Sequence, residues 1–159
     1  MNPSILAHRK RIDNLFTKVS SIPIEESEMR SEWSRYLCVL VSGFIEESLR
    51  VLLEKYCEGK AVPNIQNLVR KQIQDITNCK TNRIIEILGK FSTNWETEFR
   101  NKIESESKID GEIKNAIDTV INNRHSIAHG RSTPMSYSNI SNYYKNVKKA
   151  VEILEEIIK

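Results

Sequence analysis

The segment 28–58 places the strongest constraint on the fold of this chain. It contains no proline and only one glycine, Gly43, and its large apolar residues recur every three or four positions. That spacing puts them on one wide face of a single helix, as in a helix at the centre of a hydrophobic core. The residues on this face are Trp33, Tyr36, Leu37, Leu40, Val41, Phe44, Ile45, Leu49, Leu52, Leu53 and Tyr56. We therefore predict one long central helix over 28–58.

The rest of the chain shows the same helical spacing between well-separated breaking residues. The breakers are Pro23, Gly59 with Pro63, Gly89, Gly111, and Gly130 with Pro134. We expect further helices over about 4–19, 65–76, 81–90, 93–104, 110–130 and 138–158. No segment shows the alternation of a strand, and no internal repeat is found. The prediction is an all-α, up-and-down helical bundle of about five to seven helices, forming a single domain over residues 1–159.

Composition and charge limit the class of protein. The chain is 39% hydrophobic and 28% charged, which is too apolar for a disordered protein. Its formal net charge of +3 permits a nucleic-acid partner but is far below that of a non-specific nucleic-acid coat. Cys38, Cys57 and Cys79 are odd in number and show no CxxC spacing, which disfavours a disulfide framework or a zinc site. Since neither a signal peptide nor a membrane span is recognisable, we expect a cytoplasmic protein.

Arg124 departs from the apolar pattern of the helix predicted over 110–130. The apolar stripe of that helix passes through position 124, where a leucine or isoleucine is expected. A charged side chain on such a face must be paired, lie in an interface or act in function. His125 and His129 lie beside it. Arg124 and His129 are about 140° apart around an ideal helix and roughly 7.5 Å apart along it, so both side chains can reach one anion between them.

The residue types alone leave three interpretations open. Arg and His oppose the negative end of the helix dipole, and Gly130 follows directly, so helix termination explains much of the cluster. His125 and His129 share a helix face, as two metal ligands would. However, HSIAH lacks the glutamate of the HExxH zinc motif and no third ligand is evident, so we expect neither a metal nor another cofactor. The third interpretation is a functional anion site.

The longer string NNRHSIAHG, residues 122–130, shifts the balance towards function. It resembles the RxxxxH signature of HEPN domains, with Arg124 and His129 as its fixed members. The similarity covers roughly residues 29–59 and 112–158, and it is closest to the RiboL-PSP or MAE-like branches of that superfamily. The resemblance also implies an all-helical fold with the motif late in a penultimate long helix.

An acidic residue and one departure complete the comparison with HEPN domains. The superfamily tends to carry an acidic residue in the segment that corresponds to SGFIEESLRVLLEKY, where Glu46 is the best match and Glu47 the second. A toxin branch carries a tyrosine four residues after the motif histidine, where this chain has Thr133. Regulation through that tyrosine is therefore not implied.

The resemblance implies a metal-independent endoribonuclease that works as a homodimer, with the motif helices of two subunits meeting at a shared cleft. The 2′-hydroxyl of RNA attacks the phosphorus, histidine takes or returns the proton, and arginine holds the phosphate oxygens. The implied roles are His129 as general base or acid, Arg124 as phosphate clamp, and His125 as an orienting or second proton-transfer group. Glu46, or Glu47, would pair with Arg124, although an ordinary helix–helix salt bridge explains this carboxylate equally well.

Other residues fit a homodimer that binds RNA. Arg131, Lys145, Lys148 and Lys149 would extend a positive path for the RNA backbone, although such a run is more often a solvated helix face. Gly43 fits the close approach of a second backbone, or is simply tolerated. Closure of the motif face against a second subunit would explain an arginine in an apolar stripe.

Two functions are therefore open. The first is a ribonuclease of the toxin or phage-defence type, which cuts RNA and is restrained by an antitoxin or another defence-system partner. The second is a non-catalytic HEPN-like module that acts in protein–protein assembly or as the partner of another enzyme. The presence of both Arg124 and His129 favours the first, because a purely structural module does not need this pair.

Overall fold

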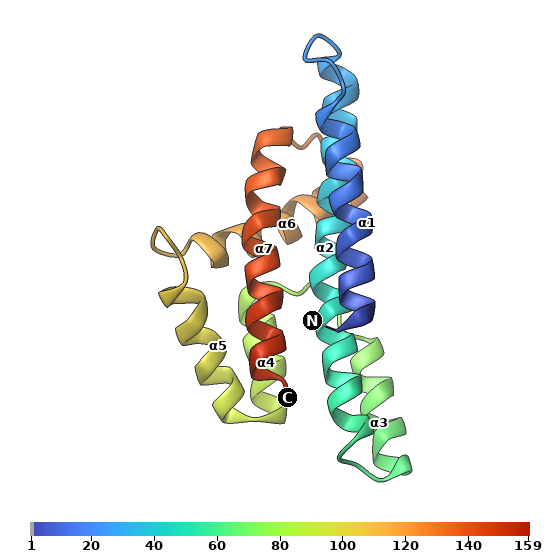
Figure 1. The fold of residues 1–159 in the computed structure, drawn as a ribbon, viewed down its shortest axis with the longest axis vertical. Helices are drawn as coiled ribbons and strands as arrows, with labels where there is room; N and C mark the ends of the chain where they lie inside the picture. Colours follow the sequence, from blue (N-terminus) through green and yellow to red (C-terminus); the bar gives the residue numbers. More distant parts are fainter. Residues whose placement is uncertain (1) are drawn as a thin grey trace.

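The computed structural model describes residues 2–159, which form seven α-helices and no strand (Figure 1). The helices are α1 (Pro3–Ser20), α2 (Ser27–Glu58), α3 (Pro63–Gln74), α4 (Thr81–Phe91), α5 (Thr93–Ser105), α6 (Glu112–Ala128) and α7 (Tyr137–Ile157). The all-α class and the number of helices predicted from the sequence are confirmed. None of these helices is long and apolar enough to cross a membrane.

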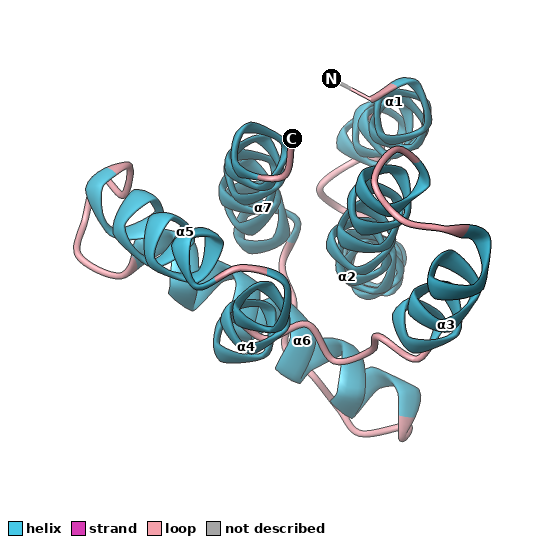
Figure 2. Cartoon of the chain, turned by 90° about the horizontal axis from the view of Figure 1, so that it is seen from below, coloured by secondary structure: helices cyan, strands magenta, loops and turns pink. Residues whose placement is uncertain are grey.

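The long helix α2 is the centre of the fold, as predicted. It packs against α1, α3, α6 and α7, and the buried side chains of all seven helices form one hydrophobic cluster. Figures 1 and 2 show α1, α2 and α7 running along the long axis of the molecule, while α6 lies across them. The C-terminal end of α6 is thereby carried past α2, away from α5.

Trp33 and Tyr36 were predicted on the core-facing side of the long helix, and this prediction was wrong. Their exposed fractions are 38% and 49%, and that of Met29, one turn earlier, is 49%. The first turns of α2 pair with α1 and extend past the end of α7 (Figure 1), so no helix covers this face. Helical spacing indicates that a helix has an apolar face, but it does not indicate whether another helix packs against that face.

The observed bounds of α3 and α6 differ from the predicted bounds by a few residues. Helix α3 begins two residues early because proline is favourable in a first helical turn. It ends before Ile76, whose carbonyl accepts hydrogen bonds from Arg50 Nε (3.2 Å) and Nη2 (2.5 Å) on α2. Helix α6 begins only after Gly111, which has a left-handed backbone (φ 69°). These tertiary contacts and backbone conformations decide where each helix stops.

The three cysteines have free thiols and are all buried. Burial raises the pKa of Cys38 to about 12, and a backbone hydrogen bond from Arg124 opposes this shift only in part. Burial also raises the pKa of Cys79 to about 12, and the negative charge of Glu46 adds to the effect. Because the thiolate is the reactive form of cysteine, the native fold should protect both thiols.

We expect Cys38 and Cys79 to react with a thiol reagent at pH 8 far more slowly in the native protein than in guanidinium. The physical reason is that both side chains are fully buried and protonated at that pH. Mass spectrometry of the labelled peptides measures the rate at each site. A Ser132→Cys variant, with its new thiol at an exposed position, is the control and should label at once. Rapid labelling of native Cys38 would contradict the packing of α6 on α2.

Candidate functional site

The end of α6 is defined by a hydrogen-bonded turn around Gly130. The Arg131 N–H donates to the Ser126 carbonyl and the Gly130 N–H donates to the Ile127 carbonyl, both at 3.0 Å. Gly130 has φ +67°, and this bond pair with a left-handed glycine is a Schellman motif. His129 is therefore the capping residue, held directly after the last turn of the helix.

His125 and His129 lie in contact at this exposed end. Their ring centroids are 4.4 Å apart with an interplanar angle of 65°, and the His129 N–H donates to the His125 carbonyl at 3.2 Å. Both side chains are exposed. Two neighbouring imidazoles can accept and donate protons on the same ligand near neutral pH.

Arg124 lies on the inner side of α6, directly before His125 and five residues before His129. Its side chain is half-buried, in line with the buried residues Ile117 and Val120. The Cys38 thiol donates to the Val120 carbonyl at 3.5 Å and also contacts the Arg124 backbone. Helix α2 therefore packs directly against this turn of α6. Within residues 2–159, no carboxylate lies within 4.0 Å of the guanidinium. The charge is therefore available to an anion from outside the chain.

The structure does not bring the predicted acidic partners to Arg124. Glu46 is buried with an exposed fraction of 7%, and its Oε1 has no hydrogen-bond partner. Its negative charge helps to raise the pKa of Cys79, in the connection between α3 and α4. Glu47 is exposed and pairs with Arg50 at 3.2 Å. The expected ion pair is not formed within this chain, and a role for Glu46 stays a prediction.

The basic residues predicted to line an RNA path differ in exposure and in their partners within the chain. Arg131 and Lys145 are exposed. Lys148 is half-buried, because its Nζ pairs with Asp13 at 3.3 Å and lies 4.4 Å from the centre of the Tyr144 ring. The Lys148 charge therefore serves the contact between α1 and α7 rather than an outside ligand. Across the described chain, 2–159, no group of three or more His, Cys, Asp or Glu side chains is placed to hold a metal ion.

Comparison with known proteins identifies the family. The family model described as RiboL-PSP-HEPN matches residues 5–159, which is nearly the whole chain. The chain belongs to the RiboL-PSP-HEPN family. HEPN domains are generally associated with ribonuclease activity. Neither a search of curated proteins nor a search of solved structures found a match.

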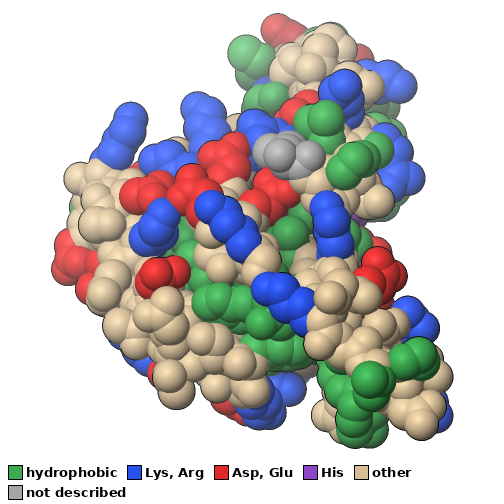
Figure 3. All heavy atoms as spheres, turned by 60° about the horizontal axis from the view of Figure 1, so that its bottom comes forward, with side chains coloured by type: hydrophobic (Ala, Val, Ile, Leu, Met, Phe, Trp, Pro, Cys, Tyr) green, Lys and Arg blue, Asp and Glu red, His purple; other side chains and the backbone are tan. Residues whose placement is uncertain are grey.

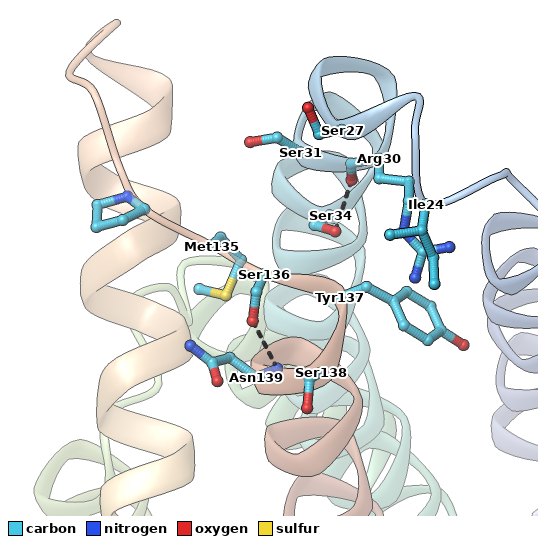
Figure 4. A pocket seen from close by; sticks show the side chains of 11 residues that line it. Ile24, Ser27, Arg30, Ser31, Ser34, Met135, Ser136, Tyr137, Ser138 and Asn139 are labelled. Carbon is cyan, nitrogen blue, oxygen red and sulfur yellow. Dashed lines mark hydrogen bonds between the residues drawn. The ribbon is translucent and has the colours of Figure 1, made fainter.

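In this HEPN domain a groove is lined in part by the segment that follows the motif in the sequence, and sequence reasoning missed it. The groove has a volume of about 560 Å³ and lies between the first turns of α2 and the segment 134–139 that opens α7. Figure 4 shows its side chains, with the last turns of α6 standing beside it. The available sequence signal was the set Ser27, Ser31 and Ser34, which recurs at helical spacing on one face of α2.

The Gly130→Ala variant of this HEPN domain should have an unfolding free energy lower by about 1–2 kcal/mol, because a left-handed backbone is strained for alanine. Nothing lies within 4 Å of a Cβ built on Gly130, so the effect is conformational and not steric. Gly59→Ala is the matched control, since Gly59 also follows a helix and has open space but has φ −87°. Urea denaturation followed by circular dichroism measures both. Equal effects of the two substitutions would contradict the proposed helix end.

Proposed function

We propose that the chain is a metal-independent endoribonuclease of the toxin or phage-defence type, with Arg124, His125 and His129 acting on one phosphodiester. The observation that carries the proposal is the contact between the exposed imidazoles of His125 and His129, whose ring centroids are 4.4 Å apart. His125 directly follows Arg124, an arginine without an ion pair inside residues 2–159. Membership of a family associated with ribonuclease activity supports it. The Schellman turn supports it further, because it holds His129 at the helix end where His125 reaches it.

The proposed reaction uses these three side chains and the 2′-hydroxyl of the RNA. The 2′-oxygen bonds to phosphorus while its proton passes to one imidazole, and the bond from phosphorus to the 5′-oxygen breaks. The leaving 5′-oxygen takes a proton from the other imidazole. Arg124 binds two non-bridging oxygens and stabilises the charge that develops on them. The products are a 2′,3′-cyclic phosphate and a 5′-hydroxyl, and the two histidines are interchangeable in these roles.

The proposal includes a homodimer formed through the exposed face of α2. Met29, Trp33, Tyr36, Leu40 and Gly43 are spaced alternately by four and three residues, which is the seam of a helix that packs along another helix. The first three are 38–49% exposed, and nothing in the chain lies within 4 Å of a Cβ built on Gly43. A second copy seated here would cover the aromatic rings and approach closely at the glycine. Such exposed apolar seams are typical of protein interfaces.

Two further partners belong to the proposal. Arg131 and Lys145 are exposed on the segments that follow the motif, so they are proposed to contact the RNA backbone. His125 and His129 are exposed too, which leaves the site open to cellular RNA. An enzyme of this kind needs restraint, for which we propose an antitoxin or another defence-system protein.

Purified protein should cleave labelled RNA in EDTA, and Arg124→Ala and His129→Ala should each lower the rate at least about 100-fold. The expected loss is large because each variant removes a group that acts in the transition state. Gel electrophoresis measures the rate, and phosphatase treatment identifies the 2′,3′-cyclic phosphate ends.

His8→Ala and Arg70→Ala are the matched controls for this cleavage assay. His8 lies on α1 with its ring against Phe44, and Arg70 is exposed on α3. Both should retain activity. Cleavage that returns only when a divalent ion is added would rule out the metal-independent mechanism. No cleavage by folded dimer would favour the non-catalytic assembly module.

Replacing both Trp33 and Tyr36 by glutamate should weaken dimerisation at least about 100-fold, because four carboxylates would face one another across the seam. Sedimentation velocity measures the assembly state. Ile109→Glu is the control, since Ile109 is 72% exposed away from this seam. A variant that remains dimeric, or a wild-type protein that is monomeric, argues against this interface.

A further inference from the structure

The groove beside the motif presents polar groups that the fold does not use. Within residues 2–159, the hydroxyls of Ser27, Ser31 and Ser138 and the side-chain amide of Asn139 make no hydrogen bond. Ser34, by contrast, donates to the Arg30 carbonyl at 2.7 Å. Figure 4 shows the unused groups around the groove on both α2 and α7. A ligand with its own donors and acceptors can therefore form hydrogen bonds with these neutral side chains.

The charges around the groove favour a neutral ligand over a phosphate. Arg30 is the charged residue among those that line it, and its Nη1 donates to the Ile22 carbonyl at 2.6 Å. The same guanidinium lies 5.3 Å from the centre of the Tyr137 ring, so its charge ties the α1–α2 connection to α7. Exposed Glu25 and Glu28 flank this end of α2 and would repel a phosphate.

The groove also offers apolar surface and enough room for a nucleobase. Met135 and Ile24 line it, and Ile24 is 80% exposed. Its volume of about 560 Å³ lies within the range of small-molecule sites, roughly 300–1,000 Å³. A nucleobase combines a flat apolar face with a hydrogen-bonding edge and carries no charge, which matches this lining.

Only a short stretch of chain separates the groove from the proposed reaction centre. Ser34 lies one helical turn from Cys38, whose thiol donates to Val120 of α6, and Pro134 follows His129 by only five residues. At about 100° per residue, Ser27, Ser31 and Ser34 lie opposite the face of Met29 and Trp33. A second copy on that outer face would therefore leave the groove open.

We propose that this groove binds the base of the ribonucleotide adjacent to the cleaved bond and so selects where the RNA is cut. The inference rests on the proposed ribonuclease function and adds to it a base-recognition site. Ser31, Ser138 and Asn139 provide the hydrogen bonds to the edge of the base, and Ile24 provides apolar contact.

RNA binding by the His129→Ala protein tests the proposal, because the proposed activity is removed while the groove is intact. Fluorescence anisotropy with a labelled single-stranded RNA of mixed sequence gives the Kd. Adding Ser138→Leu or Asn139→Ala should raise the Kd about 3- to 10-fold, as expected when a hydrogen bond is lost. In the catalytically intact protein, Asn139→Ala should also change the pattern of cleavage sites.

Ser4→Leu and Asn142→Ala are the matched controls. Ser4 is an exposed serine in the first turn of α1, as Ser138 is in α7, and Asn142 is exposed on α7 outside the groove. Both should leave the Kd and the cleavage pattern unchanged, and thermal unfolding verifies that every variant is folded.

Three results would overturn the inference. RNA bound equally by groove and control variants, with an unchanged cleavage pattern, would overturn base recognition here but leave the ribonuclease proposal intact. Mononucleotides that bind as tightly as the RNA would make a free nucleotide the occupant. Absence of both RNA binding and wild-type cleavage would overturn the groove and the proposed function together.

Discussion

The crossing of α6 over α2 determines where every part of the candidate site lies. At this crossing the fully buried Cys38 contacts the Val120 carbonyl and the Arg124 backbone. The contact sets the position along α2 at which α6 crosses it. It also fixes which turn of α6 emerges into solvent, so Arg124 is half-buried while the histidines are free. Loss of this packing would displace the motif and one wall of the groove together.

The site separates residues that support the fold from residues that do not. His125 and His129 are exposed and add little to the core, and Gly130 determines their position through its left-handed backbone. Arg124 occupies a position where an apolar residue would pack more favourably, and its charge has no partner inside the described chain. Because Arg124 has no ion pair inside the described chain, we propose that an anion or a second chain is its partner. Function and fold can therefore be tested by different substitutions.

Much of the fold could be predicted from sequence because helices are encoded locally. Spacing, prolines and glycines marked all seven helices to within a few residues, and the Arg124–His129 motif was placed correctly at the end of α6. The residues that were placed wrongly, or did not meet as expected, depend on neighbours that spacing does not identify. Trp33 and Tyr36 have helical spacing but no covering helix. Glu46 lies on the predicted helix but forms no ion pair with Arg124, since helix crossing angles decide which side chains meet.

The sequence by itself determined the helical class, the long central helix, the place of the Arg124–His129 motif at a helix end and, through its resemblance, the family. These properties depend on residue types and on spacings of a few positions, which the chain carries directly. Only the tertiary structure decided that Lys148 is used by Asp13, that Glu46 is separated from Arg124, and that a groove opens between α2 and α7. Each of these depends on the packing of helices distant in sequence. That packing is set by the whole core, so no local pattern reports it.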